Sequence, residues 1–100
     1  MPLQPHQKFP QLDQLIRAYL NQDYELSGDS IEEVVKCYLR DSPHKDHLQL
    51  LNDLTNFRQT HPSNLDTAFL VVYGFDFDPQ LWEISTLAFF EMVKLTISEF

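Results

Sequence analysis

The apolar residues near the N-terminus recur with the spacing of a helix in two consecutive stretches. Both sets follow i, i+3, i+4, i+7 and i+8, which places five side chains on one helical face. The first set is Leu12, Leu15, Ile16, Tyr19 and Leu20, and the second is Ile31, Val34, Val35, Tyr38 and Leu39. The pattern predicts one helix from Pro10 to about Asn21 and a second helix after a short acidic turn.

The second predicted helix has a start signal of its own. Ser30 and Glu33 have the spacing of a capping box, in which the hydroxyl accepts from the backbone N–H of Glu33 and the glutamate reaches back. Pro43 favours an end near Asp41-Ser42. Ser42-Pro43 can then cap a third helix that continues to about Thr60.

The next segment has two competing interpretations. Ser63 or Asn64 can cap a fourth helix over residues 65–73, and Gly74 is then expected to close it in the left-handed conformation. Residues 68–73 are rich in β-formers, so a strand stays open there. We favour the helix, because the apolar residues fit a helical stripe.

The last predicted helix starts at Asp78-Pro79 and runs from about Gln80 to near the terminus, with Trp82 opening it. It is apolar almost all round, which is typical of a helix that is central in a small bundle or partly buried in a partner. The sequence therefore predicts an all-α fold, a compact bundle of four to five helices. We expect a single domain over residues 9–100, preceded by a flexible arm of residues 1–8.

The composition of the chain limits the classes of partner that it can bind. The chain has 100 residues, a formal net charge of −8 and 43% hydrophobic residues. The negative charge argues against nucleic acid and favours a basic partner. The start lacks the apolar core of a signal peptide, and no apolar run is long enough to cross a membrane. With one cysteine as well, we expect a cytoplasmic protein that contacts no membrane.

No pattern in the sequence indicates a catalytic site. His44-x-x-His47 beside Asp46 invites a metal interpretation, but no second ligand pair supports it, and we expect solvated surface. Cys37 flanks an apolar stripe, so we expect a buried or half-buried thiol. We therefore predict no enzyme activity, no metal, no cofactor and no small-molecule substrate.

The acids cluster in two regions. No Lys or Arg lies among the acids of residues 23–33 or between Arg58 and Lys94. A solvated face with acids at helix starts explains the clusters, and so does a surface that steers onto a basic protein. Aromatic residues beside the second cluster can be anchors or core residues, and Asp23 can equally bond the backbone of its own turn. The candidate partner-binding residues are Asp23, Glu25, Asp76, Phe77, Asp78 and Trp82.

The order of several segments resembles a known family. Phe9-Pro10 leads into a helix, an Asn21-Gln22-Asp23-Tyr24 segment follows it, and Gly28 precedes Ser30-x-Glu32-Glu33-Val34-Val35. The resemblance continues loosely through the aromatic and acidic segment 75–79 and Trp82. In these features the chain resembles the CdiI-type immunity proteins of bacterial contact-dependent growth inhibition systems.

The resemblance implies a cytoplasmic protein that captures the toxic C-terminal domain of a secreted CdiA-type effector, often a nuclease. A nuclease has a cationic cleft for phosphates, which an acidic protein can fill or flank. The alternative from the residues alone is a small acidic helical adaptor or regulatory subunit of another basic protein. An effector gene directly upstream would separate the two.

Overall fold

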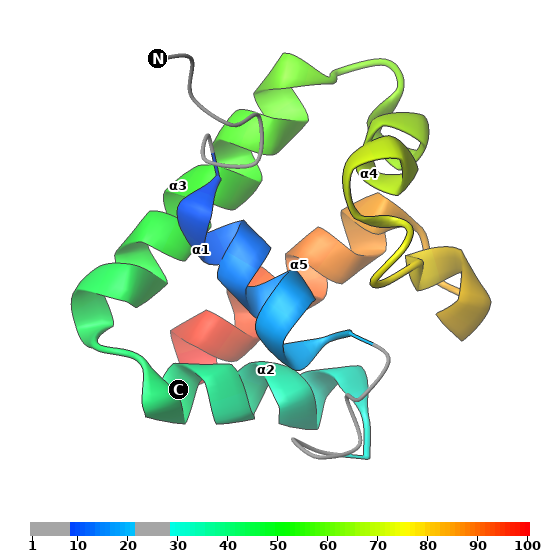
Figure 1. Cartoon of the computed structure of the whole chain (residues 1–100). Helices are drawn as coiled ribbons and strands as arrows, with labels where there is room; N and C mark the ends of the chain where they lie inside the picture. Colours follow the sequence, from blue (N-terminus) through cyan, green and yellow to red (C-terminus); the bar gives the residue numbers. More distant parts are fainter. Residues whose placement is uncertain (1–8, 22–28) are drawn as a thin grey trace, which may run out of the picture.

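Helices are the regular elements that the structure describes (Figure 1). The structure is a computed structural model, and it describes residues 9–21 and 29–100. Its elements are α1 (Pro10–Gln14), the π-helical turn η2 (Leu15–Tyr19), α2 (Ile31–Asp41), α3 (His44–Thr60), α4 (Leu65–Tyr73), the 3-10 helix η4 (Pro79–Trp82) and α5 (Thr86–Glu99). The predicted all-α fold is confirmed, and residues 68–73 are helical rather than a strand.

Helix α5 is the centre of the bundle. It packs against α2, α3 and α4, and Figure 1 shows it crossing the middle of the molecule above α2. Its inner face buries Phe89, Phe90 and Val93, while Leu87 and Leu95 on the outside are 39% and 58% exposed. Within the described ranges no helix is long and apolar enough to cross a membrane.

Aromatic rings fill the space between α1, α3, α4 and α5. The Phe57 ring on α3 lies 5.1 Å from Phe9 and 5.9 Å from both Phe69 and Phe90, measured between ring centroids. These pairs are edge-to-face, the arrangement that the quadrupole of an aromatic ring favours. Phe57 is fully buried, so one side chain of α3 holds three other segments.

The N-terminus of α1 is satisfied by a residue of another helix. Pro10 occupies the first turn and has no N–H, but the preceding Phe9 has no side chain that can cap. The backbone N–H groups of Gln11 and Leu12 instead donate to one carboxylate oxygen of Asp53 on α3, at 2.8 Å and 3.1 Å. Gln49 donates to the other oxygen at 2.8 Å. Asp53 is fully buried, and its charge faces the positive end of the α1 dipole.

The first helix changes its winding halfway. We predicted one helix from Pro10 to about Asn21, whereas α1 passes into the π-helical turn at Leu15. The N–H of Leu20 donates to the carbonyl of Leu15, five residues back, at 2.9 Å. The wider turn keeps Leu15, Ile16 and Leu20 all buried, which fits the predicted apolar face.

Helix α2 begins and ends where the sequence predicts. The Ser30 hydroxyl accepts from the N–H of Glu33 at 3.2 Å, and the Glu33 carboxylate accepts from the N–H of Asp29 at 2.8 Å. The predicted Ser30 cap is therefore confirmed, while the glutamate reaches back one residue further than a capping box requires, to Asp29 instead of Ser30. The N-cap residues of α3 and α4 are Pro43 and Asn64. Neither helix has the predicted side-chain cap, because no side chain accepts a hydrogen bond from its first turn.

Gly74 does not close α4 in the left-handed conformation, and that prediction is wrong. Its φ is −59° and its ψ is −24°, and its N–H donates to the carbonyl of Leu70 at 2.9 Å. The structure gives another reason for glycine here. A Cβ added at Gly74 would lie 2.5 Å from the Leu70 carbonyl oxygen, so the close backbone approach excludes a side chain.

The last helix starts later than predicted. Pro79 to Trp82 form η4, and Glu83 at φ 64° breaks the helical path, so Trp82 does not open α5. The Ser85 hydroxyl caps α5 by accepting from Ala88 at 3.0 Å. Asp66 at the start of α4 accepts from the N–H of Thr86 at 2.8 Å, and this backbone bond holds the pKa of the Asp66 carboxyl below its ordinary value. The carboxylate of Asp66, which belongs to another helix, therefore helps to set the residue at which α5 begins.

Replacement of Ser30 by Ala should lower the free energy of unfolding by about 1 kcal/mol, because α2 loses the acceptor for an unpaired N–H. Urea denaturation followed by circular dichroism measures the loss. Ser63→Ala is the matched control, since Ser63 is exposed and outside the capping box, and it should change stability by a few tenths of a kcal/mol at most. Equal midpoints for Ser30→Ala and wild type would contradict the capping role.

Replacement of Asp53 by Ala should be more costly. It leaves two N–H groups of α1 without an acceptor, and each unsatisfied buried donor costs roughly 1–3 kcal/mol. We therefore expect Asp53→Ala to lose roughly 2–4 kcal/mol in the same denaturation experiment. Glu99→Ala, which removes an exposed acid at the end of α5, should lose less than about 1 kcal/mol. Similar losses for the two variants would show that α1 does not depend on the carboxylate.

Candidate partner-binding surfaces

Two of the candidate acids have contacts within the protein. Asp76 lies 3.6 Å from the guanidinium of Arg17, and its side chain is 22% exposed. Asp78 caps η4, because its carboxylate accepts from the N–H of Gln80 at 2.9 Å. Both carboxylates therefore have a role in the fold, whatever else they contact. Asp23 and Glu25 lie outside the described residues.

The two candidate aromatic anchors differ in exposure. Phe77 is 4% exposed and packs between Phe69 and Phe89, with centroid separations of 6.4 Å and 5.0 Å. Its ring thus faces the core of the protein. Trp82 is half-buried, packs against the core from outside and lines a groove on the surface. Of the two aromatic candidates, Trp82 is therefore the one with an accessible ring.

Arg17 connects the first helix to the segment around Asp76. Its guanidinium donates to the carbonyl of Val72 at 3.1 Å and lies 5.4 Å from the centre of the Tyr73 ring. The Tyr73 hydroxyl donates to Asp13 at 2.6 Å. Burial raises the pKa of Tyr73, and the carboxylate of Asp13 raises it further. The network is a structural clamp between the first helix and α4, and Asp76 belongs to it.

The groove beside Trp82 has a volume of about 280 Å³. It lies where the start of α2, the segment after η4 and α5 meet. Its lining residues are Ser30, Ile31, Glu32, Trp82, Ile84 and Met92. Four of these six are apolar, so the groove can take an apolar side chain.

One acid lines the groove, and other acids lie near its lining residues in the sequence. Glu32 is in the lining and pairs with Lys36 at 3.0 Å. Glu83 lies between Trp82 and Ile84 in the chain, and Asp29 precedes Ser30. All three acids are exposed. An exposed carboxylate in the lining favours a basic group beside the apolar one.

The two histidines that suggested a metal site are separated by their environments. His44 is exposed, as expected, but His47 is 7% exposed, so the prediction of a solvated pair is wrong for His47. Its Nε2 lies 2.9 Å from the carbonyl of Leu39, which ties the start of α3 to the end of α2. In the described part of the chain, no group of three His, Cys, Asp or Glu side chains is placed to hold a metal. Cys37 is half-buried, as expected.

Sequence reasoning missed most of the groove. Ile31 was recognised as part of an apolar stripe, but nothing linked it to Ile84 and Met92, far along the chain. It also missed two strongly exposed apolar side chains, Val71 and Leu81, which are 81% and 82% exposed. Their positions follow from how α4 and η4 are rotated in the fold, and no local pattern reports that rotation.

A comparison with protein families finds a match to the CdiI immunity protein family over residues 8–97. A search of curated proteins found no match. A search of solved structures found none either. The family match spans nearly the whole chain, from before α1 to within the last turn of α5. The protein therefore belongs to the CdiI immunity protein family, the group that the order of its sequence segments resembles.

Proposed function

We propose that this protein neutralises the toxic C-terminal domain of a CdiA-type effector by binding it in the cytoplasm of the cell that makes it. The family match over residues 8–97 carries the proposal, because an immunity protein acts on a cognate toxin. Inhibition is by occupation of a surface, without catalysis and without a cofactor, nucleic acid, membrane or small-molecule substrate. The adaptor alternative accounts for the charge equally well, but it leaves the family match without an explanation.

The toxin that this surface fits is a basic protein, and we propose a nuclease. Nucleases carry cationic clefts for the phosphates of their substrate, and a protein with a net charge of −8 is drawn to such a cleft. Charge attraction of this kind mainly accelerates association and sets orientation. Tight binding then needs apolar contacts at the centre of the interface.

We propose that the Trp82 groove supplies such a contact. Its occupant is an apolar side chain of the toxin domain that has a Lys or Arg as a neighbour. The side chains of Ile31, Ile84 and Met92 can contact the apolar side chain, and the exposed carboxylate of Glu32, which also lines the groove, can pair with the Lys or Arg. Tryptophan is among the residues that most often dominate binding energy at interfaces.

Trp82→Ala should weaken binding to the cognate toxin domain on the order of tenfold or more, because the groove loses its largest apolar wall. Calorimetric titration gives the dissociation constants. Phe75→Ala is the matched control: this ring is 87% exposed and does not line the groove. It should bind within about twofold of wild type. Circular dichroism must show that both variants keep the helical fold.

The single tryptophan also gives a direct probe. Protein labelled with 5-fluorotryptophan should show one ¹⁹F resonance, which shifts when the toxin domain is added. A resonance that stays in place, together with wild-type affinity of Trp82→Ala, would place the contact elsewhere. If no effector domain binds the wild-type protein, the immunity proposal itself fails.

Glu83→Lys should slow association with the toxin domain by a few fold, because it reverses an exposed charge at the residue that follows Trp82. Glu99→Lys makes the same change in net charge at the exposed end of α5 and should have a smaller effect. Association rates measured by surface plasmon resonance should also fall as salt shortens the Debye length to about 10 Å at 0.1 M. Rates that do not depend on salt would exclude electrostatic steering.

A further inference from the structure

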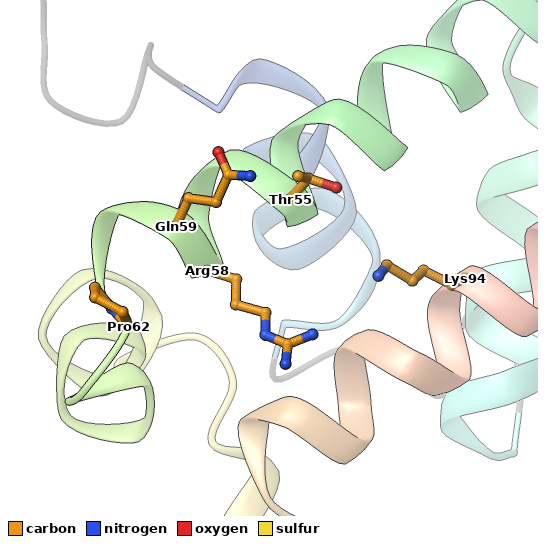
Figure 2. Close-up of a pocket in the computed structure, with 5 residues that line it drawn as sticks. All are labelled: Thr55, Arg58, Gln59, Pro62 and Lys94. Atoms are coloured by element: carbon orange, nitrogen blue, oxygen red, sulfur yellow. The ribbon is translucent and has the colours of Figure 1, made fainter.

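A second hollow on the surface is basic, in a protein that is otherwise acidic (Figure 2). It has a volume of about 390 Å³, within the range of roughly 300–1,000 Å³ that ligand pockets have. Its lining residues are Thr55, Arg58, Gln59, Pro62 and Lys94. Figure 2 shows Arg58 reaching from α3 and Lys94 reaching from α5 into the same space. These are the two cations that bound the long stretch without Lys or Arg, and the fold brings them together.

The carboxylate of Glu91 lies near both cations, but it leaves their N–H groups able to donate to a ligand. An oxygen of Glu91 is 3.6 Å from the Arg58 guanidinium and 3.9 Å from the Lys94 ammonium. A charge-assisted hydrogen bond is shorter, about 2.7–2.9 Å. Glu91 therefore interacts with both cations through charge alone. Two cations and one carboxylate leave the cluster with one formal positive charge.

The remaining wall of the hollow adds polar groups. Thr55, Arg58 and Gln59 are spaced i, i+3 and i+4 on α3, so they share one face of that helix. The Thr55 hydroxyl and the Gln59 amide can donate to an oxygen atom that the guanidinium also binds. A guanidinium holds a carboxylate through two parallel N–H donors, which fixes both distance and direction.

We propose that this basic hollow binds a single carboxylate of the toxin domain, either a side chain or the chain terminus. The inference rests on the proposed function, since the toxin supplies the group. One residual positive charge matches a carboxylate, which carries one negative charge. A phosphate carries more charge, and the net charge of −8 repels a polyanion before it reaches the hollow.

The basic hollow and the Trp82 groove lie on different sides of α5. Met92 lines the groove and Lys94 lines the hollow, and residues two apart on a helix do not face the same way. Substitutions in the hollow therefore leave the groove intact. A toxin domain that reaches both sites contacts α5 from two sides, and the carboxylate then fixes its orientation.

The first test uses the immunity protein alone, with sodium acetate as the probe. At constant ionic strength, acetate should shift the NMR signals of the Arg58 Nε–H and of the Thr55 and Gln59 amides more than chloride or inorganic phosphate does. In the double variant Arg58→Gln/Lys94→Gln, which has no Arg58 signal, acetate should no longer shift the Thr55 and Gln59 amides. No shift with acetate would overturn the proposal, and a stronger response to phosphate would show that the hollow does not select carboxylates.

The second test uses the complex with the toxin domain. Arg58→Gln/Lys94→Gln should dissociate on the order of tenfold faster than wild type, because charged hydrogen bonds are lost. Arg40→Gln/Lys45→Gln is the matched control, since it removes one Arg and one Lys that are exposed and line neither the hollow nor the groove, and it should dissociate within about twofold of wild type. Acetate should no longer shift the Arg58 signal once the toxin domain is bound.

The outcomes separate the two proposals. If the wild-type protein binds the toxin domain but both double variants dissociate alike, or acetate still enters the complex, the toxin supplies no carboxylate and the inference is overturned. If the wild-type protein binds no toxin domain, the proposed function fails and the inference that the toxin fills the hollow fails with it. The acetate titration then decides alone whether the hollow selects a carboxylate.

Discussion

The fold depends on the carboxylate of Asp53, because the N-terminal helix cannot satisfy its own first turn. Phe9 offers no capping oxygen, and the N–H groups of Gln11 and Leu12 face the interior. A buried donor without a partner is costly, so α1 is stable only where α3 supplies the acceptor. Asp53 therefore fixes the position of α1 along α3. The contact between Phe9 and Phe57 then follows from that position.

The position of α1 in turn fixes α4 and α5 through side-chain contacts. The π-helical turn carries Arg17 to the end of α4, where it contacts Val72, Tyr73 and Asp76. Asp66 at the other end of α4 accepts from Thr86 and positions the first turn of α5. Three of the acids in this protein, Asp53, Asp66 and Asp76, thus hold helices together. The negative charge of the chain is partly a structural device and is not all available to a partner.

The acids that face solvent are distributed unevenly, and this has consequences for recognition. Glu32 lines an apolar groove, whereas Glu91 lies beside a pair of cations. A partner attracted by the overall charge would meet two local surfaces of opposite character on two sides of α5. Such a pattern discriminates between basic proteins better than a uniform negative surface, because a wrong partner places like charges together. The family match assigns the partner class, and these two surfaces would select among its members.

The sequence by itself determined the elements whose signals are local. The apolar stripes predicted the helices over residues 31–41 and 65–73, and the Ser30 cap set the start of the first of them. Tertiary contacts decided the features that join distant residues: the Asp53 cap, the late start of α5 opposite Asp66, and the burial of Phe77 and His47. They also brought Arg58 to Lys94, and Ile31 to Met92. A local pattern records periodicity along one helix, but the rotation of each helix about its axis depends on packing against its neighbours, which appears only when the chain is folded.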